Sequence, residues 1–211
     1  MSEGSEASEA NKPAQMAKMD KMAEPTRSAK SDEWDHPHVM IDLETLGTEP
    51  GSVILSIGMV TIDVDDGRRE EWSRCIDVTT LLAAGFTVDT ETAQWWSRQS
   101  EEARAELWRD PRPVEEVMMA AASWLESFGP RVRVWGNAPS FDCRILATAM
   151  ERCGIDVPWR FWNERCFRTF RAMHPGVVER DGAHHDALAD ARAQAMFVVG
   201  KLNDQEQPPA E

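Results

Sequence analysis

Hydrophobic and polar residues alternate along several segments in the first third of the chain. In residues 38–46 (HVMIDLETL) apolar side chains fall at every second position, and residues 52–64 (SVILSIGMVTIDV) are apolar almost throughout. Because successive side chains of a strand point to opposite faces, these patterns predict two buried strands. The Asp-Asp-Gly sequence at residues 65–67 is typical of a hairpin turn. A third strand is therefore expected near residues 70–76, which gives an antiparallel meander.

Beyond this meander the apolar spacing becomes helical. A short helix that contains Trp95 and Trp96 is predicted first. Further helices are predicted at residues 101–108, 114–128, 140–152, 166–173 and 186–202, with a short strand at residues 132–135. Thr90 or Thr92 is expected to cap the first of these helices. Trp95 and Trp96 are adjacent there and should point apart, so at most one of them is expected to line a groove. This order of elements predicts an α/β domain with a mixed central sheet covered by helices.

Composition predicts one domain between two tails. The chain has 211 residues, and its first 33 contain no Val, Ile, Leu, Phe, Trp, Tyr or Cys, so they cannot contribute to a core. We expect a disordered tail at residues 1–34, a folded domain at residues 35–203 and a second disordered tail at residues 204–211.

The cellular setting is predicted from what the sequence lacks. No stretch approaches the roughly 18 apolar residues of a membrane span, and the N-terminal residues lack the features of a secretory signal. The four cysteines occur singly, with no C-x-x-C pair, which argues against a zinc knuckle and a disulfide framework. A cytoplasmic protein without a membrane partner is expected.

Charge restricts the partners that the protein can bind. Its formal net charge is −14, from 23 basic and 37 acidic residues. Such a field repels nucleic acid unless bound divalent cations reverse the local charge. A nucleic-acid function would therefore require a metal. From Trp34 onward the basic residues are 17 arginines and one lysine; arginine suits bidentate phosphate contact, although a GC-rich genome would produce the same bias.

Asp42 and Glu44 interrupt the first apolar strand. Residues two apart on a strand share a face, and two buried carboxylates would repel each other unless they shared a cation such as Mg²⁺ or Mn²⁺. Two further D-x-E pairs, at residues 89–91 and 204–206, occur in polar helix-start or tail sequences. There a capping or solvated acid is the better interpretation. Only the first pair is predicted to be functional.

Three further residues extend this acidic set. Asp142 falls in the first turn of a predicted helix directly after a strand, where it could serve a site or only complement the helix dipole. His185 and Asp190 flank the start of the last helix, in the sequence HHDALADARAQA. A helix cap with a solvated Asp190 is the alternative. The order of D-x-E on a strand, D at a helix start and H-x4-D at a helix is far more specific than any one part.

This combined pattern resembles the DEDDh 3′→5′ exonucleases, the group that contains proofreading exonuclease subunits, oligoribonuclease and ribonuclease T. The matching stretches are IDLETLGTEPGSVILSIGMV, GNAPSFDCRIL and HHDALADARAQA. The run D-x-E-T-L-G-T-x-P-G, followed by TAQWWSRQS, is most similar to the subgroup of phage exonuclease A and the Rv2179c-type exoribonuclease domain. The resemblance covers roughly residues 39–199, and none of the five key positions departs from the pattern. It implies a ribonuclease H-like mixed five-stranded sheet, with an antiparallel meander of three strands plus parallel strands, flanked by helices.

The resemblance also implies roles for the five residues. Asp42, Glu44 and Asp190 would hold one divalent cation, Mg²⁺ or Mn²⁺, and Asp42 would bridge to a second cation supported by Asp142. His185 would act as general base on the attacking water. General chemistry agrees, because two ions about 3.5–4 Å apart neutralise the attacking and leaving oxygens. A histidine with a pKa of about 6.5 can accept the proton of the water.

Substrate contacts are implied at the turn after the first strand. Thr45, Leu46 and Gly47 would meet the 3′ end of a single-stranded DNA or RNA, and Phe141 would stack on a base. Plain core packing is an equal alternative for Leu46 and Phe141. Dimers are common in the family, so the resemblance allows a homodimer.

The sequence thus favours a metal-dependent 3′→5′ exonuclease that releases nucleoside 5′-monophosphates. The alternatives are a non-catalytic nucleic-acid- or protein-binding module on the same fold, and a metal-dependent phosphatase or other hydrolase. No D-x-D-x-T nucleophile motif or Gly-rich phosphate loop supports the phosphatase. The choice between DNA and RNA depends on contacts to the 2′-hydroxyl that the sequence does not display.

Overall fold

The computed structural model describes residues 33–63, 69–180 and 185–206. Two compact units are distinguished, residues Met1–Asp35 and His36–Glu211, and the second contains all the elements below. The predicted N-terminal tail lies almost wholly outside the described residues, as does the predicted hairpin turn at residues 65–67. In the described part of the chain, no helix is both long and apolar enough to cross a membrane.

A five-stranded mixed sheet forms the centre of the second unit, in the order β3-β2-β1-β4-β5. The strands are β1 (His38–Thr45), β2 (Ile54–Ile62), β3 (Glu71–Cys75), β4 (Arg133–Gly136) and β5 (Glu164–Cys166). β1, β2 and β3 pair antiparallel, β4 lies parallel to β1, and β5 lies parallel to β4. The predicted α/β class with a mixed five-stranded sheet is confirmed. β5 has no counterpart among the segments predicted from the hydrophobic pattern.

A short 3₁₀-helix, η1 (Phe161–Asn163), precedes β5, and seven α-helices within the described residues flank the sheet. They are α2 (Val78–Ala83), α3 (Thr90–Trp96), α4 (Glu101–Glu106), α5 (Val114–Glu126), α6 (Asp142–Arg152), α7 (Phe167–Met173) and α8 (Ala187–Glu206). α2 was not expected, and α8 continues past the predicted domain end at residue 203. The expected threonine cap of α3 is wrong. The side chain of Asp89 caps this helix instead, accepting a hydrogen bond from the backbone N–H of Thr92 at 2.7 Å.

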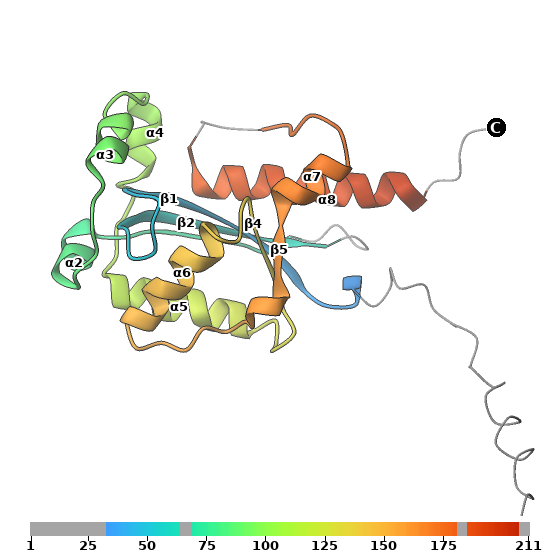
Figure 1. Cartoon of the computed structure of the whole chain (residues 1–211), viewed down its shortest axis with the longest axis horizontal. Helices are drawn as coiled ribbons and strands as arrows, with labels where there is room; N and C mark the ends of the chain where they lie inside the picture. Colours follow the sequence, from blue (N-terminus) through green and yellow to red (C-terminus); the bar gives the residue numbers. More distant parts are fainter. Residues whose placement is uncertain (1–32, 64–68, 181–184, 207–211) are drawn as a thin grey trace, which may run out of the picture. The chain divides into compact units, whose positions relative to one another are not determined.

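The two faces of β1 are covered by different helices (Figure 1). Val39, Ile41 and Leu43 belong to the hydrophobic core that α5 and α6 complete. The opposite face carries Asp42 and Glu44 and lies under α8, which contacts both β1 and β2. β1 is therefore a central strand with apolar packing on one face and two carboxylates on the other, at the end where the chain leaves the sheet.

α8 approaches the sheet closely because the contact residues are small. A Cβ atom at Gly58 of β2 would lie only 2.3 Å from the backbone carbon and oxygen of Ala187. Ala191 and Ala195 follow at four-residue spacing and are buried. The small residues of this face explain how a polar side chain of α8 can reach the carboxylates of β1.

Candidate active site

The first two carboxylates project from the central strand toward α8. Glu44 is buried with 8% of its surface exposed, and Asp42 is half-buried. The side-chain amide of Gln194 on α8 donates a hydrogen bond from Nε2 to Oδ1 of Asp42 at 2.8 Å. This contact fixes the orientation of the Asp42 carboxylate and joins β1 to the last helix.

Asp142 reaches the same place from the other side of the sheet. It is the first residue of α6, directly after the loop that follows β4, and it is almost fully buried. Its Oδ2 atom accepts a hydrogen bond from the backbone N–H of Ala138 at 3.3 Å. A Cβ atom at Gly136 would lie 2.8 Å from this oxygen. Glycine is therefore what allows the Asp142 carboxylate to pack against the end of β4.

His185 and Asp190 come from the start of α8. Asp190 is buried, and one ligand atom from each of Glu44, His185 and Asp190 lies within 4.8 Å of the others. The backbone of His185 is left-handed, with φ of 68°. A non-glycine residue rarely adopts this conformation, which costs of the order of 1 kcal/mol and is common at functional sites.

Two tryptophans of α3 hold the imidazole from the other side of the cleft. The ring centroid of His185 lies 4.7 Å from that of Trp95 and 5.9 Å from that of Trp96, both edge to face. Trp96 is buried and donates from its indole N–H to the backbone oxygen of Thr45 at 2.9 Å, whereas Trp95 is 40% exposed. Both tryptophans line the cleft, so the expectation that at most one would do so is wrong.

All five predicted residues line a single cleft of about 340 Å³. The structure thus brings together Asp42, Glu44, Asp142, His185 and Asp190, which are separated by up to 148 positions in the sequence. Among the predicted substrate contacts, the described lining includes Thr45 and Phe141 but not Leu46 or Gly47. Leu46 packs against the hydrophobic core, and so does the half-buried Phe141. Gly47 lies against Ser52, whose Oγ a Cβ there would meet at 2.5 Å.

The carboxylates raise one another's proton affinity. Burial raises the pKa of Asp42 well above its ordinary value, and the charges of Asp142, Glu44 and Asp190 raise it further. Burial, with the charges of Asp190, Asp186 and Asp142, raises the pKa of Glu44 to about 8. The pKa of Asp142 is raised by burial to about 6, although backbone N–H groups that donate to the carboxylate oppose this. Ionised carboxylates in this cluster repel one another, and bound cations would offset that repulsion.

The donor set fits hard divalent cations. Its carboxylate oxygens are the ligands that suit Mg²⁺ and Mn²⁺, and one imidazole lies beside them. A positively charged side chain already lies in the cleft, because the guanidinium of Arg180 forms an ion pair with Asp190 at 2.8 Å. The buried Oε1 atom of Gln194 has no hydrogen-bond partner among the described residues. This oxygen can accept a hydrogen bond from a metal-bound water, whereas Arg180 would compete with a metal for the Asp190 carboxylate.

Several residues that line the cleft were not predicted from the sequence, among them Gln194, Arg168 and Arg180. Gln194 follows Asp190 by four positions on a helix, so the spacing could have indicated that it shares that face. Arg168 of α7 and Arg180 of the segment before α8 also line the cleft. Their only sequence signal was the general excess of arginine.

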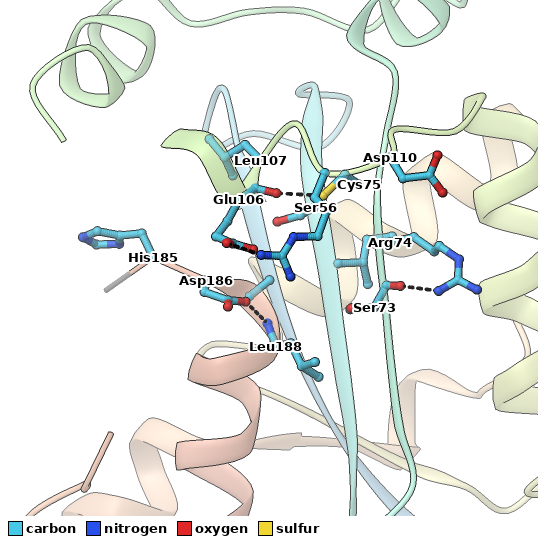
Figure 2. Close-up of a pocket in the computed structure, with 13 residues that line it drawn as sticks. Ser56, Ser73, Arg74, Cys75, Glu106, Leu107, Asp110, His185, Asp186 and Leu188 are labelled. Atoms are coloured by element: carbon cyan, nitrogen blue, oxygen red, sulfur yellow. Dashed lines mark hydrogen bonds and ion pairs between the residues drawn. The ribbon is translucent and has the colours of Figure 1, made fainter. Parts of the chain in front are cut away.

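A second cavity, of about 280 Å³, lies on the other side of the α8 start (Figure 2). The imidazole of His185 points away from the Cys75 and Glu106 side of this cavity in the figure. The thiol of Cys75 donates a hydrogen bond to the backbone oxygen of Glu106 at 3.2 Å, and burial raises its pKa. Asp186 caps α8 through the backbone N–H of Leu188 at 3.0 Å. A protonated thiol and a capping acid are structural groups, which leaves the chemistry to the first cleft.

Comparison with known proteins agrees with this geometry. Residues 37–200 match the family model described as the 3′-5′ exoribonuclease Rv2179c-like domain. Among solved structures, the chain is similar to the crystal structure of cell-death related nuclease 4 (CRN-4), with 13% sequence identity and a TM-score of 0.53. That similarity covers 80% of this chain but only 64% of the other, and it concerns the fold alone. No curated protein matches the chain. Because the family model spans most of the described domain, the chain belongs to the Rv2179c-like family of 3′-5′ exoribonuclease domains.

Proposed function

We propose that the protein is a metal-dependent 3′→5′ exonuclease that removes nucleoside 5′-monophosphates from the 3′ end of single-stranded RNA or DNA. One observation carries this proposal: four carboxylates and a histidine, from three separate elements, line one cleft, and ligand atoms of Glu44, His185 and Asp190 lie within 4.8 Å of one another. Membership of the exoribonuclease domain family supports the same activity.

The cleft would hold two divalent cations, Mg²⁺ or Mn²⁺. Asp42, Glu44 and Asp190 would bind one of them, and Asp42 with Asp142 would bind the other. Bound there, such ions neutralise the charge that develops on the attacking and leaving oxygens and lower the pKa of a bound water. They would also offset a net charge of −14, which otherwise repels a polyanionic substrate.

The protein's own residues would orient the reactants. A ring nitrogen of His185 would accept the proton of the attacking water. Trp95 and Trp96 hold this imidazole by edge-to-face contacts, so its direction is set before the substrate arrives. Gln194 fixes the Asp42 carboxylate in the same way. Phe141, at the rim of the cleft, would contact the terminal nucleotide.

The decisive experiment follows the direction and the products of cleavage. The full chain would be incubated with Mn²⁺ or Mg²⁺ and with matched 12-nucleotide RNA and DNA strands that carry a 5′ label. We expect a ladder that shortens by one nucleotide at a time, with nucleoside 5′-monophosphates as the released product. EDTA should stop the reaction.

A matched pair of variants separates the site from a general charge effect. Glu44→Gln removes a carboxylate from the cleft, whereas Glu91→Gln removes the equivalent residue of the D-x-E pair at the exposed start of α3. The first should lose the ladder and the second should keep it. Strand shortening by wild type that is equally fast in EDTA would contradict the proposal. Chelator-insensitive binding without cleavage would identify a binding module instead.

A further inference from the structure

Basic residues are concentrated along one short segment of this acidic domain. Residues 160–171 contain four arginines and a single acid, Glu164. Two large aromatic residues in the same segment are exposed, Phe161 at 77% and Trp162 at 62%. We call the following set the arginine strip: Arg160, Phe161, Trp162, Arg165, Arg168 and Arg171. Arginines combined with exposed aromatic rings are what sequence-independent binding of a single strand requires.

Three of the four arginines of the strip have no carboxylate partner among the described residues. These are Arg160, Arg168 and Arg171, and all three are exposed. Glu164 is adjacent to Arg165 on β5, so the two side chains point to opposite faces of the strand. Its carboxylate instead accepts a hydrogen bond from the indole N–H of the buried Trp159 at 3.1 Å.

Packing of α7 fixes where its arginines point. Phe167 contacts the ring of Phe197 on α8, and Phe170 contacts that of Trp135 on β4, each at a centroid distance of 5.7 Å. These two aromatic residues form the buried side of the short helix. Arg168 and Arg171 are three positions apart and therefore lie together on its outer side.

The strip is continuous with the candidate active site. Arg168 lines the cleft, and its backbone N–H donates a hydrogen bond to the backbone oxygen of Asn137 at 3.1 Å, in the loop before Asp142. β5 is the edge strand of the sheet and runs parallel to β4 (Figure 1), so its carboxyl end lies beside that of β4, which leads to the cleft residues Asn137 and Asp142. Phe161 and Trp162 precede the strand and lie at its other end. The strip thus leads away from the cleft along the edge of the sheet.

The aromatic end of the strip is held in place. The ring centroids of Phe161 and Trp162 lie 4.9 Å apart in an edge-to-face contact. The Nη1 atom of Arg165 donates to the backbone oxygen of Trp162 at 2.9 Å. The Arg165 contact anchors the backbone that carries the rings, which reduces the conformational freedom lost when a base stacks on them.

We propose that the arginine strip binds the part of a single-stranded nucleic acid that lies upstream of the scissile 3′ end. This inference rests on the proposed exonuclease function and adds the path of the strand. Its arginines contact phosphates and its rings stack on bases without selecting a sequence. The wall formed by α3 and α4 is a poor alternative path, because residues 89–110 contain six acids against three arginines. A strand that is too short to reach the strip gains nothing from it.

The test compares substrates of two lengths. The ratio of kcat/KM for a 12-nucleotide strand to that for a dinucleotide is measured for wild type and for the double variant Arg160→Glu/Arg171→Glu. We expect the variant to lower this ratio about tenfold. The matched control is Arg104→Glu, an exposed arginine of α4 without an ion pair among the described residues, which should leave the ratio unchanged. Thermal melting checks that each variant folds.

Binding is measured separately, with a 5′-fluorescein-labelled 12-nucleotide oligouridylate, by anisotropy in EDTA. Phe161→Ala/Trp162→Ala should weaken binding about tenfold at all salt concentrations. Arg160→Glu/Arg171→Glu should also flatten the dependence of log Kd on log salt concentration by about 1.4, because two phosphate contacts are lost.

The outcomes distinguish this inference from the proposed function. Suppose that the strip variants cleave RNA or DNA with an unchanged ratio of kcat/KM between long and short strands and with unchanged affinity. The proposed role of the strip would then be wrong, and the proposed exonuclease function would stand. Strip-dependent binding without cleavage by wild type would support the strip and refute the exonuclease. If the variants change the oligomeric state on size-exclusion chromatography but not the affinity for the oligonucleotide, the strip is a self-association surface and the proposal is wrong.

Discussion

The carboxylate cluster (Asp42, Glu44, Asp142 and Asp190) and the arginine strip differ in how far their charged groups are buried. Glu44, Asp142 and Asp190 are buried and close together, and the pKa values of Glu44 and Asp142 are raised. In the strip, Arg160, Arg168 and Arg171 are exposed, and Arg168 is the one that lines the cleft. Burial makes the cluster require cations, whereas exposure lets the strip attract phosphates over the screening length of about 8 Å. The difference teaches that a protein with a net charge of −14 can offer a local surface for an anionic strand.

The largest expected effect comes from Asp42→Asn, which breaks the cluster and leaves the strip intact. Asparagine keeps the size of the side chain and an oxygen that can accept from Gln194, so the fold should persist. If Asp42 binds both cations, as proposed above, loss of its charge should lower the rate of cleavage by about 10³-fold or more. Gel assays give the rate, and oligonucleotide anisotropy in EDTA should be within twofold of wild type. A variant that retains a tenth of the wild-type rate would show that Asp42 is not at the reacting centre.

A smaller loss of cleavage rate is expected from Gly58→Ala. This substitution should displace the start of α8 without changing any charge. The new methyl group would overlap the backbone of Ala187, so the start of α8 must shift away from β2. A shift of about 1 Å in His185 and Asp190 should cost about 10²-fold in rate. Overpacking should also lower the melting temperature by about 5 °C.

The control for this variant is the same substitution on α8 itself. A Cβ atom at Gly200 would meet nothing within 4 Å. Gly200→Ala should therefore keep the wild-type rate and raise the melting temperature slightly, because alanine favours the helix. Equal rates for the two alanine variants would refute the close approach of α8 to β2.

The same contrast explains what could be predicted from the sequence. Asp42 and Glu44 are candidates because they interrupt an apolar strand. The combined spacing with Asp142, His185 and Asp190 predicts one site, and the structure places all five residues in one cleft. β1 and β2 were predicted for the same reason: buried strands carry a strong local pattern. Charges in a buried setting are conspicuous in the sequence because they violate that pattern.

The elements that escaped prediction depend on distant partners. β5 has only three residues and no apolar alternation, and it exists because it pairs with β4 about 30 positions earlier. Arg168 and Arg180 are ordinary surface residues until the fold places them beside the cleft. Adjacent Trp95 and Trp96 both reach His185, because α3 is seven residues long and its end faces the cleft, a geometry that helix periodicity alone does not give.

Without metal, the stability of the protein should depend on pH through the carboxylate cluster. The pKa of Glu44 is about 8 in the folded protein, above its ordinary value of 4.5, so the folded state retains a proton that the unfolded state releases. Stability from this group is present below about pH 4.5 and is lost as the pH rises toward 8. In EDTA, the melting temperature should therefore fall by about 5 °C between pH 5.5 and pH 8.

Divalent cations and a neutral side chain should each remove this pH dependence. Mn²⁺ should restore the melting temperature at pH 8, since a cation neutralises the ionised carboxylates. Glu44→Gln cannot ionise, so in EDTA it should melt above wild type at pH 8 and near wild type at pH 5.5. A melting temperature of wild type that rises with pH in EDTA would contradict the raised pKa of the cluster.

The smallest effect is expected where an arginine of the chain enters the cluster. Arg180 pairs with Asp190 at 2.8 Å, so a metal must displace its guanidinium or share the carboxylate with it. Arg180→Ala should therefore tighten Mn²⁺ binding about two- to fivefold by calorimetry, the range of a partly exposed ion pair. Arg192→Ala is the matched control, because Arg192 pairs with Glu71 at 2.7 Å and does not line the cleft. Weaker Mn²⁺ binding by Arg180→Ala would contradict this prediction. It would mean that Arg180 supports the metal site, so that an arginine would help to bind a ligand in the cluster as well as in the strip.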